Sequence, residues 1–227
     1  MAEILVIAAH PDDEVLGCGG AIARHARAGD SVRVVIMAEG VTSRTGPTAQ
    51  AEVLGQLKVA ATKANQILGA NELIMEGLPD NRIDSMDRLA VIQRVEAHIE
   101  RWQPSIVYTH HVGDVNVDHQ LVHHAVVTAC RPQPLCCVER LLFFEVASST
   151  EWQPPGSGVP FQPNWFVDIT ETLDAKLAAL DAYRVEMREW PHPRSLRAVE
   201  HMARWRGASV GVTAAEAFSL GRQILHI

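Results

Sequence analysis

The chain has 227 residues, 47% of them apolar and 21% charged, and a formal net charge of −7 with neutral histidines. This size and composition predict a single globular domain over residues 1–227, with a core large enough to hold a shaped pocket. The negative charge and the lack of any block of lysines or arginines argue against nucleic-acid binding, and no apolar stretch approaches the roughly 20 residues that a membrane span needs.

The N-terminal segment and the cysteines both favour a cytoplasmic protein. The segment MAEILVIAAHPDDE is apolar for only about six residues before an acidic cluster, which is too short and too acidic for a secretory signal. The four cysteines form no CxxC pair, so we expect reduced, mostly buried thiols.

The first elements in chain order form a strand–helix–strand unit. Residues 4–9 (ILVIAA) are apolar without alternation, as expected of a parallel strand that is covered on both faces. A helix is predicted over about 17–28, with Gly29 as its C-terminal stop, and a second strand over 32–38.

The rest of the chain continues this alternation, interrupted by two long loops at 39–47 and 148–163. The second loop is so rich in Pro and Gly that no regular element is expected there, and its length is typical of a lid or binding loop that borders a pocket. The other predicted strands and helices, in chain order, are a helix at 48–68, a strand at 73–75, a helix at 85–102, a strand at 106–109, a helix at 119–129, strands at 140–147 and 165–169, a helix at 171–189 and a last helix that follows 191–195 and runs to about 206.

This order predicts an α/β, Rossmann-like fold with a mostly parallel sheet and helices on both faces. Two polar clusters, at 10–14 and 110–119, directly follow predicted strands. Because ligands bind at the carboxyl ends of the strands in such sheets, the clusters should converge on one edge, although they are about 100 residues apart.

Both clusters are rich in side chains that ligate metals. Residues 10–14 (HPDDE) place three carboxylates and an imidazole within one turn, and a divalent cation is the simplest way to neutralise them. An isolated cluster of this kind could also be a solvated acidic turn that caps a helix. Residues 109–119 add three histidines and two aspartates, which favours the cation. Two imidazoles and one carboxylate with open positions suit catalytic zinc and ferrous iron equally.

Particular motifs carry a family resemblance. The chain has AHPDDE at 9–14 after a strand, then Gly17, Gly19 and Gly20, and an Asp118-His119 pair that opens a helix. With these motifs it resembles the LmbE-like, or GlcNAc-PI de-N-acetylase (PIG-L), family. The resemblance extends over most of the chain, including the stretches TETLDAKLAAL and HPRS.

The resemblance implies an LmbE-like fold and metal-dependent hydrolysis of the N-acetyl group of an N-acetylglucosamine-type amino sugar or its conjugate, which releases acetate and a free amine. It implies one Zn²⁺ per chain, with Fe²⁺ or another divalent ion as the alternative. The ligands it implies are His10, Asp13 and His119, with Asp12 as the general base.

The chain departs from the family pattern at one position. Many members have H-P-D-H, whose first His helps to stabilise the oxyanion, where this chain has Asn116. An asparagine can donate a hydrogen bond to an oxyanion but cannot be protonated, so the acid role must fall elsewhere. His111, and next His110, are the candidates, the alternative being a hydrogen-bonded histidine at a strand end. Asp118 is expected to orient an imidazole.

Other assignments depend on less specific features. Arg44, Arg82 and His192 are candidate substrate-binding residues, and some family branches carry a His where Tyr183 aligns. We expect a small-molecule amino-sugar substrate and no nucleic acid, and a homo-oligomer is compatible with the sequence. The alternatives are a non-catalytic sugar- or nucleotide-binding protein and another metal-dependent hydrolase. The sequence does not name the group attached to the sugar.

Overall fold

The computed structural model describes residues 1–40 and 47–226, and over these residues it shows one seven-stranded sheet of order β3-β2-β1-β4-β5-β7-β6. Neighbouring strands from β3 to β5 are parallel, whereas β7 is antiparallel to both β5 and β6. The expectation of a mostly parallel α/β sheet is confirmed. The strands are β1 (Glu3–Ala8), β2 (Ser31–Ala38), β3 (Glu72–Leu78), β4 (Ile106–His110), β5 (Arg140–Phe144), β6 (Trp165–Asp168) and β7 (Ala215–Gln223).

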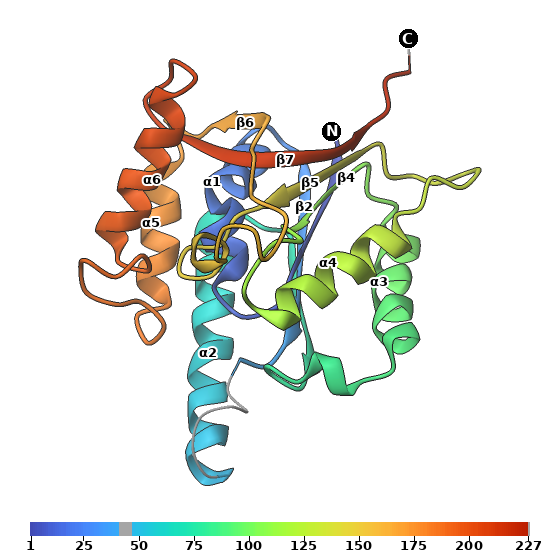
Figure 1. The fold of residues 1–227 in the computed structure, drawn as a ribbon, viewed down its shortest axis with the longest axis horizontal. Helices are drawn as coiled ribbons and strands as arrows, with labels where there is room; N and C mark the ends of the chain where they lie inside the picture. The colour runs from blue at the N-terminus through green and yellow to red at the C-terminus, as the bar shows by residue number, and fades with distance from the viewer. Residues whose placement is uncertain (41–46, 227) are drawn as a thin grey trace.

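Helices cover both faces of the sheet (Figure 1). One layer holds α1, α2, α5 and α6, and the other holds α3 and α4. No helix in the described part of the chain is long and apolar enough to cross a membrane. The helices are α1 (Asp13–Arg27), α2 (Pro47–Leu68), α3 (Arg88–Trp102), α4 (Val117–Ala129), α5 (Leu173–Ala182) and α6 (Leu196–Ala208), with short 3₁₀ turns η1 (Ile83–Ser85) and η2 (Thr150–Trp152).

The central strand β1 has apolar residues on both of its faces, which explains why its sequence does not alternate between apolar and polar residues. Ile4 and Val6 belong to the core on the side of α1, whereas Leu5 and Ile7 belong to the core on the side of α3 and α4. A strand with a helical layer on each face needs an apolar residue at every position.

The structure differs from the predicted elements in several places. Strand β7 is not evident from the sequence, because AEAFSLGRQ includes residues of low strand propensity and gains its order by pairing between β5 and β6. The helix expected at 171–189 ends at Ala182, where the chain turns so that Tyr183 can reach into the site. Helix α1 begins at Asp13, four residues before the expected start, and the loop at 148–163 contains the turn η2.

Candidate metal centre

The topology brings the two polar clusters together. Strands β1 and β4 are parallel neighbours, so the segments that follow them leave the same edge of the sheet. His10 lies just after β1, Asp13 opens α1, and His119 lies in the first turn of α4. Asn116 caps α4, since its side-chain oxygen accepts hydrogen bonds from the backbone N–H groups of Asp118 at 2.8 Å and His119 at 3.4 Å.

Three side chains form a compact ligand group. His10 Nδ1 lies 3.3 Å from His119 Nε2 and 3.3 Å from Asp13 Oδ2, and His119 Nε2 lies 3.1 Å from the same carboxylate oxygen. A tetrahedral zinc ion with bonds of about 2.0–2.2 Å separates its ligands by about 3.3–3.6 Å. The other carboxylate oxygen of Asp13 is buried and has no hydrogen-bond partner within residues 1–40 and 47–226. Buried polar atoms normally have a partner, and a bound cation would be the partner of this oxygen.

Each imidazole of the group turns its second nitrogen toward another buried carboxylate. His10 Nε2 lies 3.1 Å from Asp118 Oδ2 and 3.3 Å from Asp80 Oδ1, and His119 Nδ1 lies 3.2 Å from Asp114 Oδ2. Carboxylates placed this way fix the orientation of ligating histidines and raise their basicity. His10, Asp80 and Asp118 could themselves hold an ion, but we assign the ion to the group with two imidazoles, which are preferred ligands of zinc and iron.

The carboxylates that support the imidazoles are held in turn. Asp118 Oδ1 accepts a hydrogen bond from the backbone N–H of Ile83 at 3.1 Å. Asp114 accepts hydrogen bonds from the hydroxyls of Ser149 and Thr150, the second at 2.8 Å. The start of the Pro/Gly-rich loop therefore supports the site.

The charges of the group also fit a divalent ion. Burial lowers the pKa of His10, but the carboxylates of Asp118 and Asp13 raise it to about 10. Burial likewise lowers the pKa of His119, but Asp13 and Asp114 raise it to about 9. The carboxylates around the two rings therefore favour positive charge there, and a bound divalent cation would supply that charge in place of protons.

Asp12 lies beside the ligand group and is bound by an arginine. Its backbone φ of 101° is in the left-handed region. For a residue other than glycine this conformation costs on the order of 1–3 kcal/mol, and such strained residues are concentrated at functional sites. Asp12 Oδ2 accepts a hydrogen bond from Arg194 Nη1 at 2.9 Å, and Arg194 Nε donates to Ser148 Oγ at 2.7 Å. Burial raises the pKa of Asp12 well above its ordinary range, although Arg194 opposes the shift.

Glu14, the third carboxylate of HPDDE, holds the backbone of Asp12 in place. Glu14 Oε1 accepts hydrogen bonds from Tyr183 Oη at 2.6 Å and Asn65 Nδ2 at 3.0 Å, and its other oxygen accepts one from the backbone N–H of Asp12 at 3.1 Å. Burial raises its pKa to about 7. Tyr183 serves here to hold Glu14.

Neither candidate proton donor belongs to the ligand group. The Nε2 atom of His111 lies 3.0 Å from the carbonyl oxygen of Val159, so His111 contacts the Pro/Gly-rich loop. The Nε2 atom of His110 accepts a hydrogen bond from the backbone N–H of Ala9 at 2.8 Å, and its ring stacks on that of His119 at a centroid distance of 4.0 Å. The geometry favours the hydrogen-bonded strand-end alternative for both.

A cleft of about 440 Å³ lies next to the site, because its lining includes Asp118, which contacts His10, and Arg194, which contacts Asp12. The loop at 148–163 borders it through Ser148, Ser149 and Trp152. The cleft is lined by Asn81, Asp84, Val115, Asn116, Val117, Asp118, Ser148, Ser149, Trp152 and Arg194.

Of the candidate substrate-binding residues, none lines this cleft in the described part of the chain. Arg82 is exposed and is not among the lining residues. His192 accepts a hydrogen bond from the backbone N–H of Arg194 at 3.1 Å and packs edge-on against Trp152, so it shapes the turn behind the cleft. Arg44 lies outside the described residues. Sequence reasoning selects His192 from the HPRS stretch, whereas Arg194 of the same stretch is the residue that reaches Asp12.

Fold and site together define the class of protein. It is an α/β protein whose mostly parallel sheet carries a candidate metal centre at the carboxyl ends of two neighbouring strands, where such sheets bind ligands. The family model described as GlcNAc-PI de-N-acetylase (PIG-L) matches residues 5–130. The chain belongs to this deacetylase family.

The individual relatives include a deacetylase and an enzyme named for a different reaction. The chain is 31% identical to an uncharacterized deacetylase, YaiS, of Escherichia coli (strain K12), over 80% of this chain and 90% of that protein. It is 30% identical to 4-oxalmesaconate hydratase of Pseudomonas putida, over 83% of this chain and 75% of that protein.

Among solved structures, a conserved protein of Thermus thermophilus matches with a TM-score of 0.79 and 27% identity, over 100% of this chain and 98% of that one. N,N'-diacetylchitobiose deacetylase of Pyrococcus horikoshii shares the fold, with a TM-score of 0.77 and 19% identity over 96% of this chain and 83% of that one.

Proposed function

We propose that this protein is a metal-dependent N-deacetylase that hydrolyses the N-acetyl group of an N-acetylglucosamine-type amino sugar or its conjugate. The observation that carries the proposal is the group of His10, Asp13 and His119. Asp12 lies next to this group but is not one of its metal ligands. We propose Zn²⁺ as the ion, one per chain, since His10, Asp13 and His119 supply the two imidazoles and one carboxylate of a catalytic zinc site, a set that ferrous iron also accepts. Membership of a deacetylase family supports the reaction class.

The roles of the chain's own residues follow from their contacts. A bound divalent ion polarises a carbonyl and lowers the pKa of water toward about 7. Asp12 accepts the proton of the attacking water and later donates it to the amine that leaves. Arg194 occupies Oδ2 of Asp12, so Oδ1 is the atom that takes the proton. Asp118 and Asp114 keep the two ligating rings in place.

We assign the oxyanion contact to the amide nitrogen of Asn116. The side-chain oxygen of Asn116 is committed to capping α4, which directs Nδ2 away from the helix. That nitrogen lies 3.3 Å from Asn81 Oδ1, and both residues line the cleft. An amide donor fixed in advance can stabilise charge that develops on a carbonyl oxygen.

Replacing Asn116 should separate this role from helix capping. Asn116→Ser keeps a capping oxygen but removes the amide, so we expect near-normal melting temperature and metal content with kcat lowered about 10²–10³-fold. The Michaelis constant should change little, because the bond forms chiefly to the developing charge. Asn116→Ala, which also removes the cap, should lose about 0.5–2 kcal/mol of stability in addition. A stable, fully metallated Asn116→Ser protein with unimpaired kcat would exclude the oxyanion role.

The lining of the cleft suits a polar substrate such as a sugar. Its acidic side chains are Asp84 and Asp118, and the charge of Arg194 is offset by Asp12. Trp152 is 52% exposed and offers a flat apolar surface beside polar groups, which suits a sugar ring.

The relationship to 4-oxalmesaconate hydratase gives a second candidate function, the addition of water to an unsaturated carboxylate. The same ligand group and Asp12 could activate water for that reaction. The family model that the chain matches is that of a deacetylase, which favours the first function.

A substrate panel distinguishes the two functions. The zinc-loaded protein should release acetate from N-acetylglucosamine and its glycosides, and should leave the ultraviolet absorbance of unsaturated dicarboxylates unchanged. Loss of that absorbance without acetate release from any N-acetyl sugar would favour the hydratase and overturn the proposal.

A further inference from the structure

Helix α1, which carries Asp13, is broken in its middle. Its backbone leaves the helical region at Cys18, where φ is −148° and ψ is 24°. In an unbroken helix the N–H groups of Gly20 and Ala21 would bond to carbonyl oxygens four residues earlier, and the first of these belongs to Leu16. The break frees these backbone groups inside the protein, where unpaired polar groups are costly.

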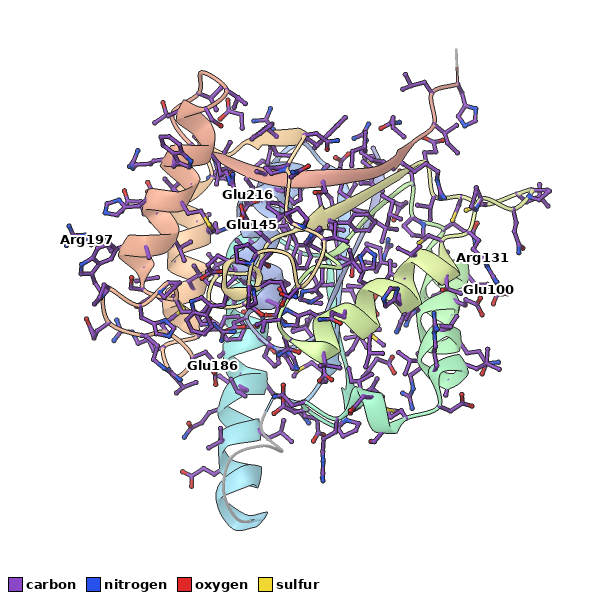
Figure 2. All side chains as sticks on the ribbon, viewed as in Figure 1. Glu100, Arg131, Glu145, Glu186, Arg197 and Glu216 are labelled. Carbon is purple, nitrogen blue, oxygen red and sulfur yellow. The ribbon has the colours of Figure 1, made fainter. Side chains whose placement is uncertain are left out.

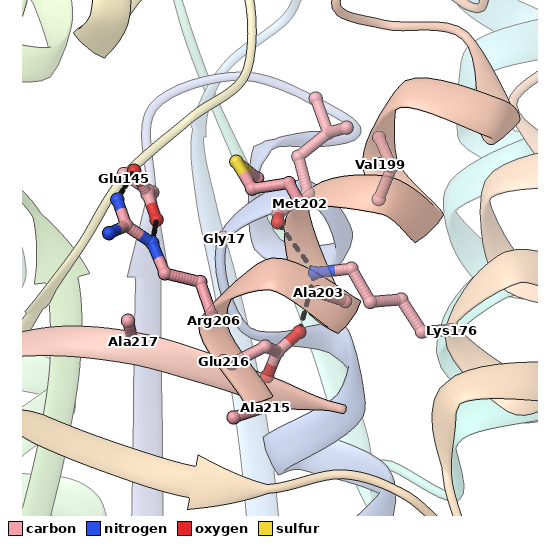
Figure 3. A pocket seen from close by; sticks show the side chains of 11 residues that line it. Gly17, Glu145, Lys176, Val199, Met202, Ala203, Arg206, Ala215, Glu216 and Ala217 are labelled. Carbon is pink, nitrogen blue, oxygen red and sulfur yellow. Dashed lines mark hydrogen bonds and ion pairs between the residues drawn. The ribbon is translucent and has the colours of Figure 1, made fainter. Parts of the chain in front are cut away.

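A buried ion pair of Lys176 and Glu216, drawn in Figure 3, takes up the freed groups. The two carboxylate oxygens of Glu216 accept hydrogen bonds from Gly20 N–H at 2.9 Å and Ala21 N–H at 2.7 Å. Lys176 Nζ donates to the Leu16 carbonyl oxygen at 2.8 Å and to Glu216 Oε1 at 2.6 Å. The pair thus binds both sides of the break.

The pair comes from distant parts of the chain. Lys176 lies on α5 and Glu216 on β7, and their side chains are 2% and 4% exposed. Figure 2 shows Glu216 in the interior, whereas charged residues such as Arg197 and Arg131 lie at the periphery. Burying two charges is expensive and gives little net stability compared with apolar residues of similar size, so a role in specifying one local geometry explains the pair better.

The glycines around the break allow this close packing. A Cβ atom on Gly17 would lie 2.3 Å from the ring of Phe144, and one on Gly20 would lie 2.7 Å from Ile169. The glycines at 17–20 therefore serve to pack α1 against the sheet and its neighbours. The three carboxylates that precede them also disfavour a glycine-rich loop that binds a nucleotide. The hollow beside the ion pair measures about 10 Å³, which holds at most one water, so it is not a ligand site.

We propose that Lys176 and Glu216 are positioning residues of the metal centre. By fixing the break in α1, they set where its first turn lies, and hence where the carboxylates of Asp13 and Glu14 point. The inference rests on the proposed function only in taking Asp13 as a metal ligand.

The test compares two double variants in metal binding. Lys176→Met with Glu216→Gln removes the charged pair without leaving a lone buried charge. Arg206→Met with Glu145→Gln is the matched control, because that pair lines the same hollow and its two hydrogen bonds, of 2.8 and 2.7 Å, join one side chain to the other. Each metal-free protein is titrated with Zn²⁺ by calorimetry, and the visible absorption spectrum of its Co²⁺ form is recorded.

We expect the Lys176→Met, Glu216→Gln protein to bind Zn²⁺ about 10–100-fold more weakly, with a changed Co²⁺ spectrum, as when a supporting partner of a ligand is lost. The control should stay within about twofold of wild type. Unchanged affinity and spectrum in the folded double variant would overturn the inference. If that variant does not fold, Lys176→Gln with Glu216→Gln replaces it, since it also leaves no lone buried charge, with the same direction of change expected and the same overturning result. A wild-type protein that binds no metal would instead overturn the proposed function.

Discussion

Replacing Asp12 with asparagine should leave a folded, metal-bound protein whose kcat is about 10²–10⁴-fold lower, since that is the usual contribution of a general base. Asparagine is the suitable probe because Asp12 has a φ of 101°, and asparagine tolerates positive φ better than alanine does. Its amide oxygen can still accept the hydrogen bond that Arg194 donates to the carboxylate. The variant therefore removes the basic oxygen and little else.

Two measurements on the same preparation decide the role of Asp12. Elemental analysis should find wild-type metal content, and single-turnover kinetics should show the loss in the chemical step. A fully metallated variant that turns over at nearly the wild-type rate would show that Asp12 is not the general base and that its charge adds little to turnover.

Replacing His10 with alanine should weaken the binding of Zn²⁺ by more than about 100-fold, because the loss of a mere supporting partner already costs about 10–100-fold. His10 contributes one of three mutually close ligand atoms, and it also connects the group to Asp118. His124→Ala is the matched control, since His124 is an exposed histidine on the same helix as His119. It should bind Zn²⁺ as the wild type does.

Chelator-treated protein titrated with Zn²⁺ gives the affinities of both variants. If His10→Ala retained full affinity, the assignment of the ligands would be wrong, and the group of His10, Asp80 and Asp118 would be excluded with it.

The sheet and the convergence of the clusters could be predicted from the sequence because both depend on local patterns. Unbroken apolar runs such as ILVIAA mark parallel strands, and a polar cluster directly after each of two strands must appear at the carboxyl edge. His10, Asp13 and His119 lie together in the structure at that edge.

Residues whose role depends on distant partners could not be predicted in this way. Arg194 reaches Asp12 from 182 residues away, and nothing in the HPRS stretch indicates which of its side chains turns inward. In the sequence, Glu216 is a polar residue in a weak strand pattern. Its role appears only in the structure, where the break in α1 leaves two N–H groups that donate hydrogen bonds to its carboxylate. The contact of His111 could not be predicted for the same reason, since its partner is the carbonyl oxygen of Val159 in a loop that has no regular pattern.

The most direct test of the central claim is reconstitution of the metal-free protein with Zn²⁺ while acetate release from an N-acetylglucosamine glycoside is followed. We predict no release before metal is added, a linear rise with added Zn²⁺, and a plateau at about one ion per chain. Acetate release that is unaffected by removing the metal, or no release from any N-acetyl sugar by protein that holds one ion per chain, would contradict the claim.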